Sequence, residues 1–264
     1  MRNRTGLSGS LTALFVAAQL FFGSAEAYEY PSVERGFKPE RAFQVGDIDN
    51  IRIFNGGLEV AIPIGGRYPI RGGFSYGLSL SYSSQPWDYI QHDPPPPAGG
   101  PYTQAWPVRG ANAGLGWRLS LGEFLDGMVI GIGTCQFCYI DPSGARHQFY
   151  QTLHPDLPDD GPTRYTRDGT YLRLRQIAGG WEIDFPNGEI HKFDTAGRLV
   201  QMRDRFGNSA SVIYGANSWT ISDTHGRTHF VNLVSVPYYG KAVGSVNLAA
   251  FDGSRAIYTF RRSQ

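Results

Sequence analysis

The clearest chemical motif in the sequence is a cysteine pair, Cys135-x-x-Cys138, which contains the only two cysteines of the chain. A redox role requires a helix N-terminus or a nearby cation that lowers the pKa of one thiol. The flanking Gly133-Thr134 and Asp141-Pro142 indicate strand and turn instead. For an exported protein a structural disulfide is therefore the favoured interpretation, with unpaired thiols and a redox or metal role as alternatives.

The histidines and one acidic loop give weaker signals. His225 and His229 have the spacing of two metal ligands on a helix, but Gly226 places them in a hairpin. Residues four apart in a hairpin are not one helical turn apart, so the spacing does not indicate a metal site there. His147 stands alone in the sequence. Asp156–Gly161 contains three carboxylates, yet their spacing differs from that of an EF-hand, and a solvated acidic loop is favoured. We predict no metal site and no cofactor.

Two carboxylate pairs, Glu123/Asp126 and Glu182/Asp184, have the residue types that glycoside hydrolysis needs. Their separations depend on which strands are neighbours, and Glu182 and Asp184 would share a face on any strand with alternating polar residues. No phosphate-binding glycine-rich loop precedes a predicted helix. The sequence therefore favours a protein that is not an enzyme, with glycosidase activity as the weakest alternative.

A third set of candidate residues is aromatic and lies in residues 83–113. Pro94–Pro97 and Gly99-Gly100 predict a long loop with a stiff polyproline II centre. The aromatic side chains that flank this centre are Trp87, Tyr89, Tyr102 and Trp106. Their rings are candidates for stacking on a sugar or a peptide, and the alternative is that they pin the loop to its own domain.

The elements that must position these residues are short strands. The chain has 34 Gly and 17 Pro among 264 residues, together with 15 Tyr and 16 Phe, which favours strands joined by tight turns. We predict an all-β fold built as an antiparallel meander or ribbon of hairpins. Its expected parts are an N-terminal arm at 28–50, an N-terminal β region at 51–134 and a hairpin-repeat region at 135–264.

The strongest pattern in the repeat region is a turn motif, Asp-x-x-Gly, which occurs four times. The Asp side chain can accept hydrogen bonds from main-chain N–H groups of the turn, and the Gly adopts positive φ. The predicted turn residues, with the polar residue that follows the Gly in three copies, are Asp141, Gly144, Asp194, Gly197, Arg198, Asp204, Gly207, Asn208, Asp223, Gly226 and Arg227. We therefore expect consecutive hairpins.

The run Phe193-Asp194-Thr195-Ala196-Gly197-Arg198-Leu199, followed by Asp204-Arg205-Phe206-Gly207-Asn208 and Tyr214, resembles the RHS or YD repeat. Asp223–Arg227 is similar to a degenerate second copy, and the segments around 54–82 and 114–117 resemble the region that precedes the repeats in bacterial RHS proteins. The resemblance implies a long β-ribbon that spirals into a hollow shell, as in toxin complexes and teneurins. With few repeats and no toxin tip, the chain is expected to be a part or a truncated remnant of such a shell.

The N-terminus has the layout of a secretory signal at residues 1–27. Arg2 and Arg4 precede the apolar run Leu11–Phe22, and Ala25-Glu26-Ala27 fits a cleavage site. We expect export to the periplasm, the cell surface or the medium, without stable membrane insertion after cleavage. The remaining chain would carry 22 basic and 22 acidic residues, which argues against nucleic acid as a partner.

These observations predict an exported, non-enzymatic RHS/YD-type β module. Its expected partners are the remaining shell, its cargo protein or a cell-surface glycan. The alternative is a free-standing secreted domain that binds a glycan or a peptide through the aromatic residues of the proline-rich loop.

Overall fold

The computed structural model describes residues 35–36, 42–44, 48–53, 55–92, 99–108, 110–126, 137–159, 161–237 and 240–261. The predicted signal peptide and most of the predicted arm lie outside these ranges. The described residues form antiparallel strands and no helix, which confirms the all-β prediction. Accordingly, this part of the chain has no helix long and apolar enough to cross a membrane.

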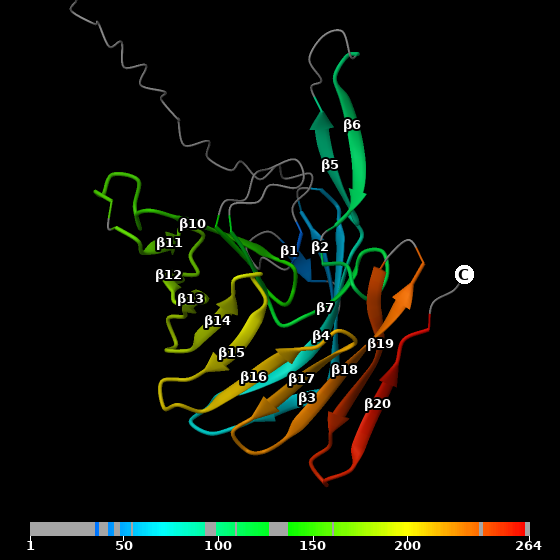
Figure 1. The fold of residues 1–264 in the computed structure, drawn as a ribbon. Helices are drawn as coiled ribbons and strands as arrows, with labels where there is room; N and C mark the ends of the chain where they lie inside the picture. The colour runs from blue at the N-terminus through cyan, green and yellow to red at the C-terminus, as the bar shows by residue number, and fades with distance from the viewer. Residues whose placement is uncertain are drawn as a thin grey trace, which may run out of the picture.

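The largest element is a 13-stranded antiparallel meander in which each strand pairs with its neighbours in sequence (Figure 1). Its strands are β8 (Glu123–Leu125), β9 (Cys138–Ile140), β10 (Arg146–Tyr150), β11 (Arg164–Thr166), β12 (Arg173–Ile177), β13 (Gly180–Asp184), β14 (Ile190–Asp194), β15 (Leu199–Arg203), β16 (Ser209–Tyr214), β17 (Ser218–Asp223), β18 (Thr228–Val236), β19 (Gly240–Ala249) and β20 (Arg255–Thr259). The predicted meander of hairpins is therefore present.

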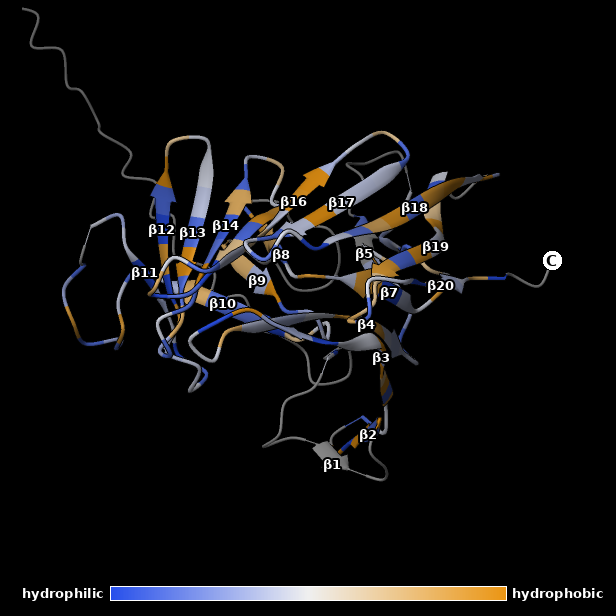
Figure 2. Ribbon diagram, turned by 90° about the horizontal axis from the view of Figure 1, so that it is seen from below, coloured by the Kyte–Doolittle hydropathy of each residue, from blue (hydrophilic) through white to orange (hydrophobic). Residues whose placement is uncertain are grey.

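A second sheet has five strands in the order β1-β2-β3-β4-β7. These strands are β1 (Ala42–Gln44), β2 (Asp49–Arg52), β3 (Leu58–Pro69), β4 (Ser75–Ser83) and β7 (Trp117–Ser120). The long β3–β4 hairpin forms a layer under the meander (Figure 2). It places segments more than a hundred residues apart in sequence against each other.

The predicted loop at 83–113 contains two further strands, which corrects the sequence interpretation. β5 (Trp87–His92) and β6 (Tyr102–Pro107) pair with each other and project from the body of the molecule (Figure 1). Tyr89, Tyr102 and Trp106 belong to short β-favouring runs, but the proline and glycine residues between them suggested irregular structure. The Pro94–Pro97 segment itself lies outside the described residues.

One hydrophobic core fills the space between the two sheets. In β16 the inward side chains are Ala210 and Val212, and in β4 they are Tyr76 and Leu78, so alternate residues are buried as a strand with one covered face requires. Each sheet thereby covers the apolar face of the other. Because side chains of both sheets fill this interior, the described part of the chain is a packed two-layer structure.

Candidate functional site

The four Asp-x-x-Gly turns share one hydrogen-bond pattern. The N–H of each Gly donates to the carbonyl of its Asp at 2.9–3.3 Å, and each Gly has φ between +78° and +90°. One carboxylate oxygen, Oδ1, accepts from the N–H groups two and four residues after the Asp, at 2.8–3.1 Å. This is a three-residue hairpin loop with Gly in the left-handed region, and the short motif is sufficient to specify it.

The second carboxylate oxygen, Oδ2, is left for the residue that follows the Gly. Three turns use it in this way, at 2.7 to 2.9 Å, with Arg198 Nε on Asp194, Asn208 Nδ2 on Asp204 and Arg227 Nε on Asp223. In the first turn the residue after the Gly is Ala145, which has no donor side chain. There Asp141 Oδ2 instead lies 3.6 Å from Nε2 of His147, two residues further along the chain.

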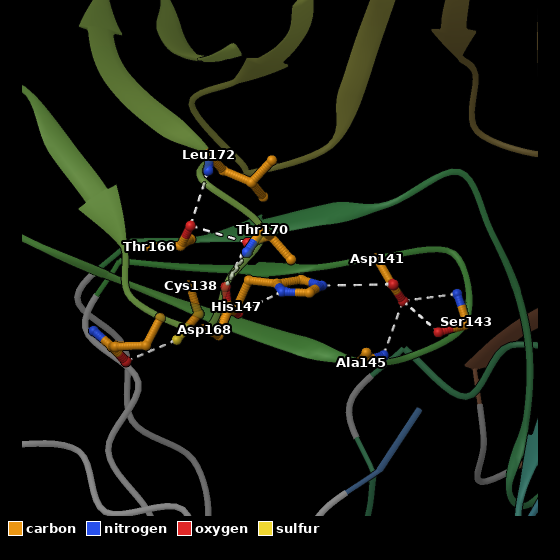
Figure 3. Close-up of polar contacts among 10 residues, drawn as sticks. Cys138, Asp141, Ser143, Ala145, His147, Thr166, Asp168, Thr170 and Leu172 are labelled. Atoms are coloured by element: carbon orange, nitrogen blue, oxygen red, sulfur yellow. Dashed lines mark hydrogen bonds and ion pairs between the residues drawn. The ribbon is translucent and has the colours of Figure 1, made fainter. Parts of the chain in front are cut away.

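His147, which stands alone in the sequence, lies between two carboxylates in the structure (Figure 3). It sits on β10, with Asp141 in the β9–β10 turn and Asp168 in the β11–β12 turn, and its Nδ1 lies 2.7 Å from Asp168 Oδ2. Burial lowers the pKa of His147, but its ion pairs with the Asp141 and Asp168 carboxylates outweigh burial and raise its pKa to about 9. At neutral pH both nitrogens therefore carry protons, and the ring joins the two turns.

This arrangement restricts the chemistry of His147. Burial raises the pKa of Asp168, yet hydrogen bonds from His147 and Thr170 lower it to about 2, so the carboxylate stays ionised. Ser143 Oγ donates to Asp141 Oδ1 at 2.7 Å and not to the imidazole. With both ring nitrogens protonated, Nδ1 bonded to Asp168 and Nε2 paired with Asp141 at 3.6 Å, His147 has no lone pair with which to act as a general base.

A second polar cluster lies in the core between β4 and the meander. The hydroxyl of Tyr76 lies 2.9 Å from Asp223 Oδ2 and 2.8 Å from His229 Nε2. The N–H of Ala249 donates to His229 Nδ1 at 3.0 Å, so a neutral imidazole carries its proton on Nε2 and donates it to Tyr76. Tyr76 then donates its own proton to Asp223, so each polar group in the series Ala249–His229–Tyr76–Asp223 has a hydrogen-bond partner.

Burial sets the protonation of this cluster. Desolvation lowers the pKa of His229 to about 4. The pKa of Tyr76 is raised by desolvation and by its hydrogen bond to the negative Asp223 carboxylate. Asp223 stays ionised because hydrogen bonds from Tyr76 and Arg227 lower its pKa against the effect of burial. Sequence reasoning placed His229 in a hairpin but did not find these contacts, because Tyr76 lies 153 residues away.

Three successive turns at one end of the meander hold the tip of the β3–β4 hairpin. We call them the docking turns, and they are Asp204–Gly207, Asp223–Gly226 and Ala250–Gly253. Arg227, which follows the second, donates through Nη2 to the Pro69 carbonyl at 2.7 Å, and Phe251 in the third stacks on Tyr68 at 5.3 Å between ring centroids. In the first, Phe206 packs against Gly72. The Asp-x-x-Gly turns thus also connect the two sheets.

The Asp194 turn lies at the other end of the meander and contacts β8. The N–H of Phe124 donates to the Gly197 carbonyl at 2.8 Å. A Cβ atom on Gly197 would lie 1.9 Å from the Phe124 carbonyl oxygen, so this approach requires glycine as well as positive φ.

The cysteine prediction is only partly covered by the described residues. Cys138 is buried and disulfide-bonded, and its Sγ lies 3.0 Å from Oε1 of Gln148 (Figure 3). Cys135 lies outside the described residues. Phe137 has φ of 60°, which bends the chain out of regular strand geometry directly before Cys138.

The four aromatic candidates do not form one platform. Cross-strand pairing places Trp87 opposite Pro107 and Tyr89 opposite Ala105, whereas Trp106 lies opposite Asp88 and Tyr102 opposite His92. Because successive residues of a strand face opposite sides, Trp87 and Tyr89 share one face of the hairpin, and Tyr102 and Trp106 share the other. All four are exposed, and the base of the hairpin is fastened by Arg35, which donates to Asp88 at 2.9 Å and to the Trp87 carbonyl.

Two other signals do not develop into sites. Gly73–Gly77 matches the Gly-x-Ser-x-Gly pattern of hydrolases, which the sequence analysis missed, but Ser75 begins β4 with no helix after it, and its Oγ accepts from Arg67 Nε at 3.1 Å. Among the described residues, no three His, Cys, Asp or Glu side chains are grouped to hold a metal ion. No family model and no curated protein matches the sequence, so the geometry of these residues is the basis for assigning a function.

Proposed function

We propose that this chain is an exported, non-enzymatic β module of RHS/YD type that supplies a run of Asp-x-x-Gly hairpins to a larger β-ribbon. The observation that carries the proposal is the open end of the core at β20. A ribbon of this kind grows by adding one hairpin beside the last, so it needs an unpaired backbone edge and an uncovered apolar row at the same place.

The backbone of β20 fits the first requirement. β20 is the last strand in the sheet order and has a neighbour, β19, on one side only within the described residues. The N–H of Phe260 points toward β19 and donates to the Gly244 carbonyl at 3.0 Å. Because peptide groups alternate along a strand, those of Ile257 and Thr259 point away from β19, toward an added strand.

The side chains of β20 fit the second requirement. Ala256 pairs with Leu248 and Tyr258 with Val246, so they continue two core positions that are at most 1% exposed. Tyr258 itself is 37% exposed, and Phe251 in the preceding turn is 68% exposed. The apolar row therefore continues onto β20, where an apolar face of another hairpin would cover it.

The non-enzymatic part of the proposal is supported by the state of the titratable groups. His147 is protonated on both nitrogens between two carboxylates, and His229 and Tyr76 are enclosed in the core. The exported part rests on the leader-like residues 1–27, and the neutral balance of charge after them favours a protein or glycan partner.

The edge is tested with two matched isoleucines in the full chain. Ile257 on β20 and Ile213 on the interior strand β16 are 65% and 70% exposed. Without its partner strand, wild type is expected to self-associate in sedimentation-velocity experiments as concentration rises. Ile257→Lys should remove the association, because a charge on an edge strand opposes pairing, and Ile213→Lys should retain it. A monomeric wild type, or equal effects of both variants, would contradict the proposal.

The projecting β5–β6 hairpin supports a second candidate, a glycan- or peptide-binding domain. Every residue of β6 is exposed, which leaves the two aromatic faces open to a ligand. Single variants separate the faces, since Trp87→Ala alters one and Trp106→Ala the other. Retention on a glycan column that falls in one variant only would support this candidate, and retention that neither variant changes would exclude these faces.

A further inference from the structure

His229 is enclosed at the point where the two sheets meet. It is 1% exposed and lies beside Tyr68 of β3, at 4.3 Å between ring centroids, and Tyr76 of β4. Both ring nitrogens are engaged, Nε2 by the Tyr76 hydroxyl and Nδ1 by the main-chain N–H of Ala249. The imidazole therefore belongs to the meander, is bonded there to β19, and contacts β3 and β4 of the second sheet.

A second proton on His229 has no place in this geometry. Nδ1 is a hydrogen-bond acceptor, so protonation would set its N–H against the N–H of Ala249. It would also bury a positive charge that the surrounding core cannot solvate.

The charged groups around the ring provide no free counter-ion. Among the described residues, Asp223 is the one carboxylate that acts on the ring, and its Oδ2 already accepts from Tyr76 and from Arg227, at 2.7 Å in the second case. Arg227, which follows the second docking turn, and Arg255 on β20 both disfavour a positive charge on the His229 ring. The remaining titratable neighbours, Tyr68 on β3 and Tyr76 on β4, are neutral phenols whose pKa values burial raises.

We propose that His229 is an acid-sensitive latch between the sheets, and that its protonation separates the β3–β4 hairpin from the docking turns while the meander stays paired. Separation hydrates the imidazole and frees Nδ1 from Ala249. The β14–β16 part of the meander can persist because its hairpins are closed by the Asp194 and Asp204 turns, whose hydrogen bonds do not involve the ring. This device is independent of whether β20 accepts a further strand.

The latch is tested by hydrogen exchange with mass spectrometry at pH 6.5 and pH 4.0, corrected for the intrinsic exchange rate. An imidazole of pKa about 4 in the closed state and about 6.5 when hydrated raises the opening constant about a hundredfold over this interval. Wild type should therefore lose protection in residues 58–83 at pH 4.0, while β13–β16 keep theirs. Protection of residues 58–83 at pH 4.0 would overturn the proposal.

Two variants identify the group responsible. His229→Gln should keep residues 58–83 protected at both pH values, whereas His191→Gln, which removes another buried histidine of the meander, should open as wild type does. If His229→Gln does not fold, Arg255→Gln serves instead, because Arg255 is exposed and its loss removes one repelling charge. The midpoint of opening should then move to lower pH, and an unchanged or higher midpoint would overturn the proposal.

Discussion

Two glycines at equivalent turn positions should differ sharply in their tolerance of a methyl group. Gly197 and Gly207 both end an Asp-x-x-Gly turn, with φ of +78° and +86°. A Cβ on Gly207 would meet no atom within 4 Å, whereas a Cβ on Gly197 would lie 1.9 Å from the Phe124 carbonyl oxygen. The pair therefore separates the intrinsic cost of positive φ from the cost of losing a docked contact.

The magnitudes follow from these two terms. Alanine at positive φ costs about 1–2 kcal/mol, and loss of chain entropy in the unfolded state returns about 0.4–1 kcal/mol, so Gly207→Ala should lose about 1 kcal/mol. Gly197→Ala must also push the turn off β8 and break the bond from the Phe124 N–H to the Gly197 carbonyl. Unsatisfied buried groups cost about 1–3 kcal/mol, and Phe124 is 1% exposed, so its packing also suffers. We expect a total loss of about 3–5 kcal/mol.

The measurement is urea unfolding of both variants with the disulfide intact. The midpoint should fall slightly for Gly207→Ala and several-fold more for Gly197→Ala, with the m-value unchanged. Equal losses would refute the conclusion that close contact with β8 requires glycine at position 197, and a larger loss at Gly207 would reverse the assignment of the crowded and the uncrowded glycine.

Three further perturbations test the polar clusters. Tyr76→Phe keeps the ring but leaves Asp223 and His229 without a shared partner, and urea unfolding at pH 7 should show a loss of about 1–3 kcal/mol; no loss would mean that the hydroxyl is unimportant. His147→Gln should lose most free energy of unfolding, relative to wild type, below pH 6.5, because a raised folded-state pKa stabilises the protonated fold. The difference in free energy should shrink by at most about 3 kcal/mol as pH rises through 9, and a difference that does not change with pH would contradict this. Asp168→Asn should lower the pKa of His147 toward its ordinary value in an NMR titration, and an unchanged titration would show that Asp168 does not hold the charge.

The local part of the fold could be predicted because each Asp-x-x-Gly turn is self-sufficient. The Asp194 carboxylate and the positive φ of Gly197 fix one hairpin through contacts within the turn itself. The turn, the two strands beside it and the meander can therefore be predicted from short-range sequence pattern. The β5–β6 hairpin was missed for the converse reason. Its strands are joined across residues 93–101, and no short turn signal marks their pairing.

The contacts that define the polar clusters could not be predicted, because they join residues that are distant in sequence. Asp168 reaches His147 across 21 residues, and Asp223 reaches Tyr76 across 147. One local signal was present, since Ala145 replaces the donor residue that follows the Gly in the other turns. That substitution leaves Asp141 Oδ2 available and points to another cation nearby, although it does not identify His147.

The docking of the β3–β4 hairpin has a consequence for the order in which the protein folds. Hydrogen bonds hold its tip to residues that lie 137 and 158 positions later in the chain, whereas each meander hairpin closes between neighbours. Loop closure over such distances is slow, so local hairpins should form first and the early β3–β4 segment should wait for them. Pulse-labelled exchange should protect β13–β16 before residues 58–83. During synthesis the apolar face of that hairpin would remain bare until most of the chain has emerged, which makes it the segment most in need of a chaperone.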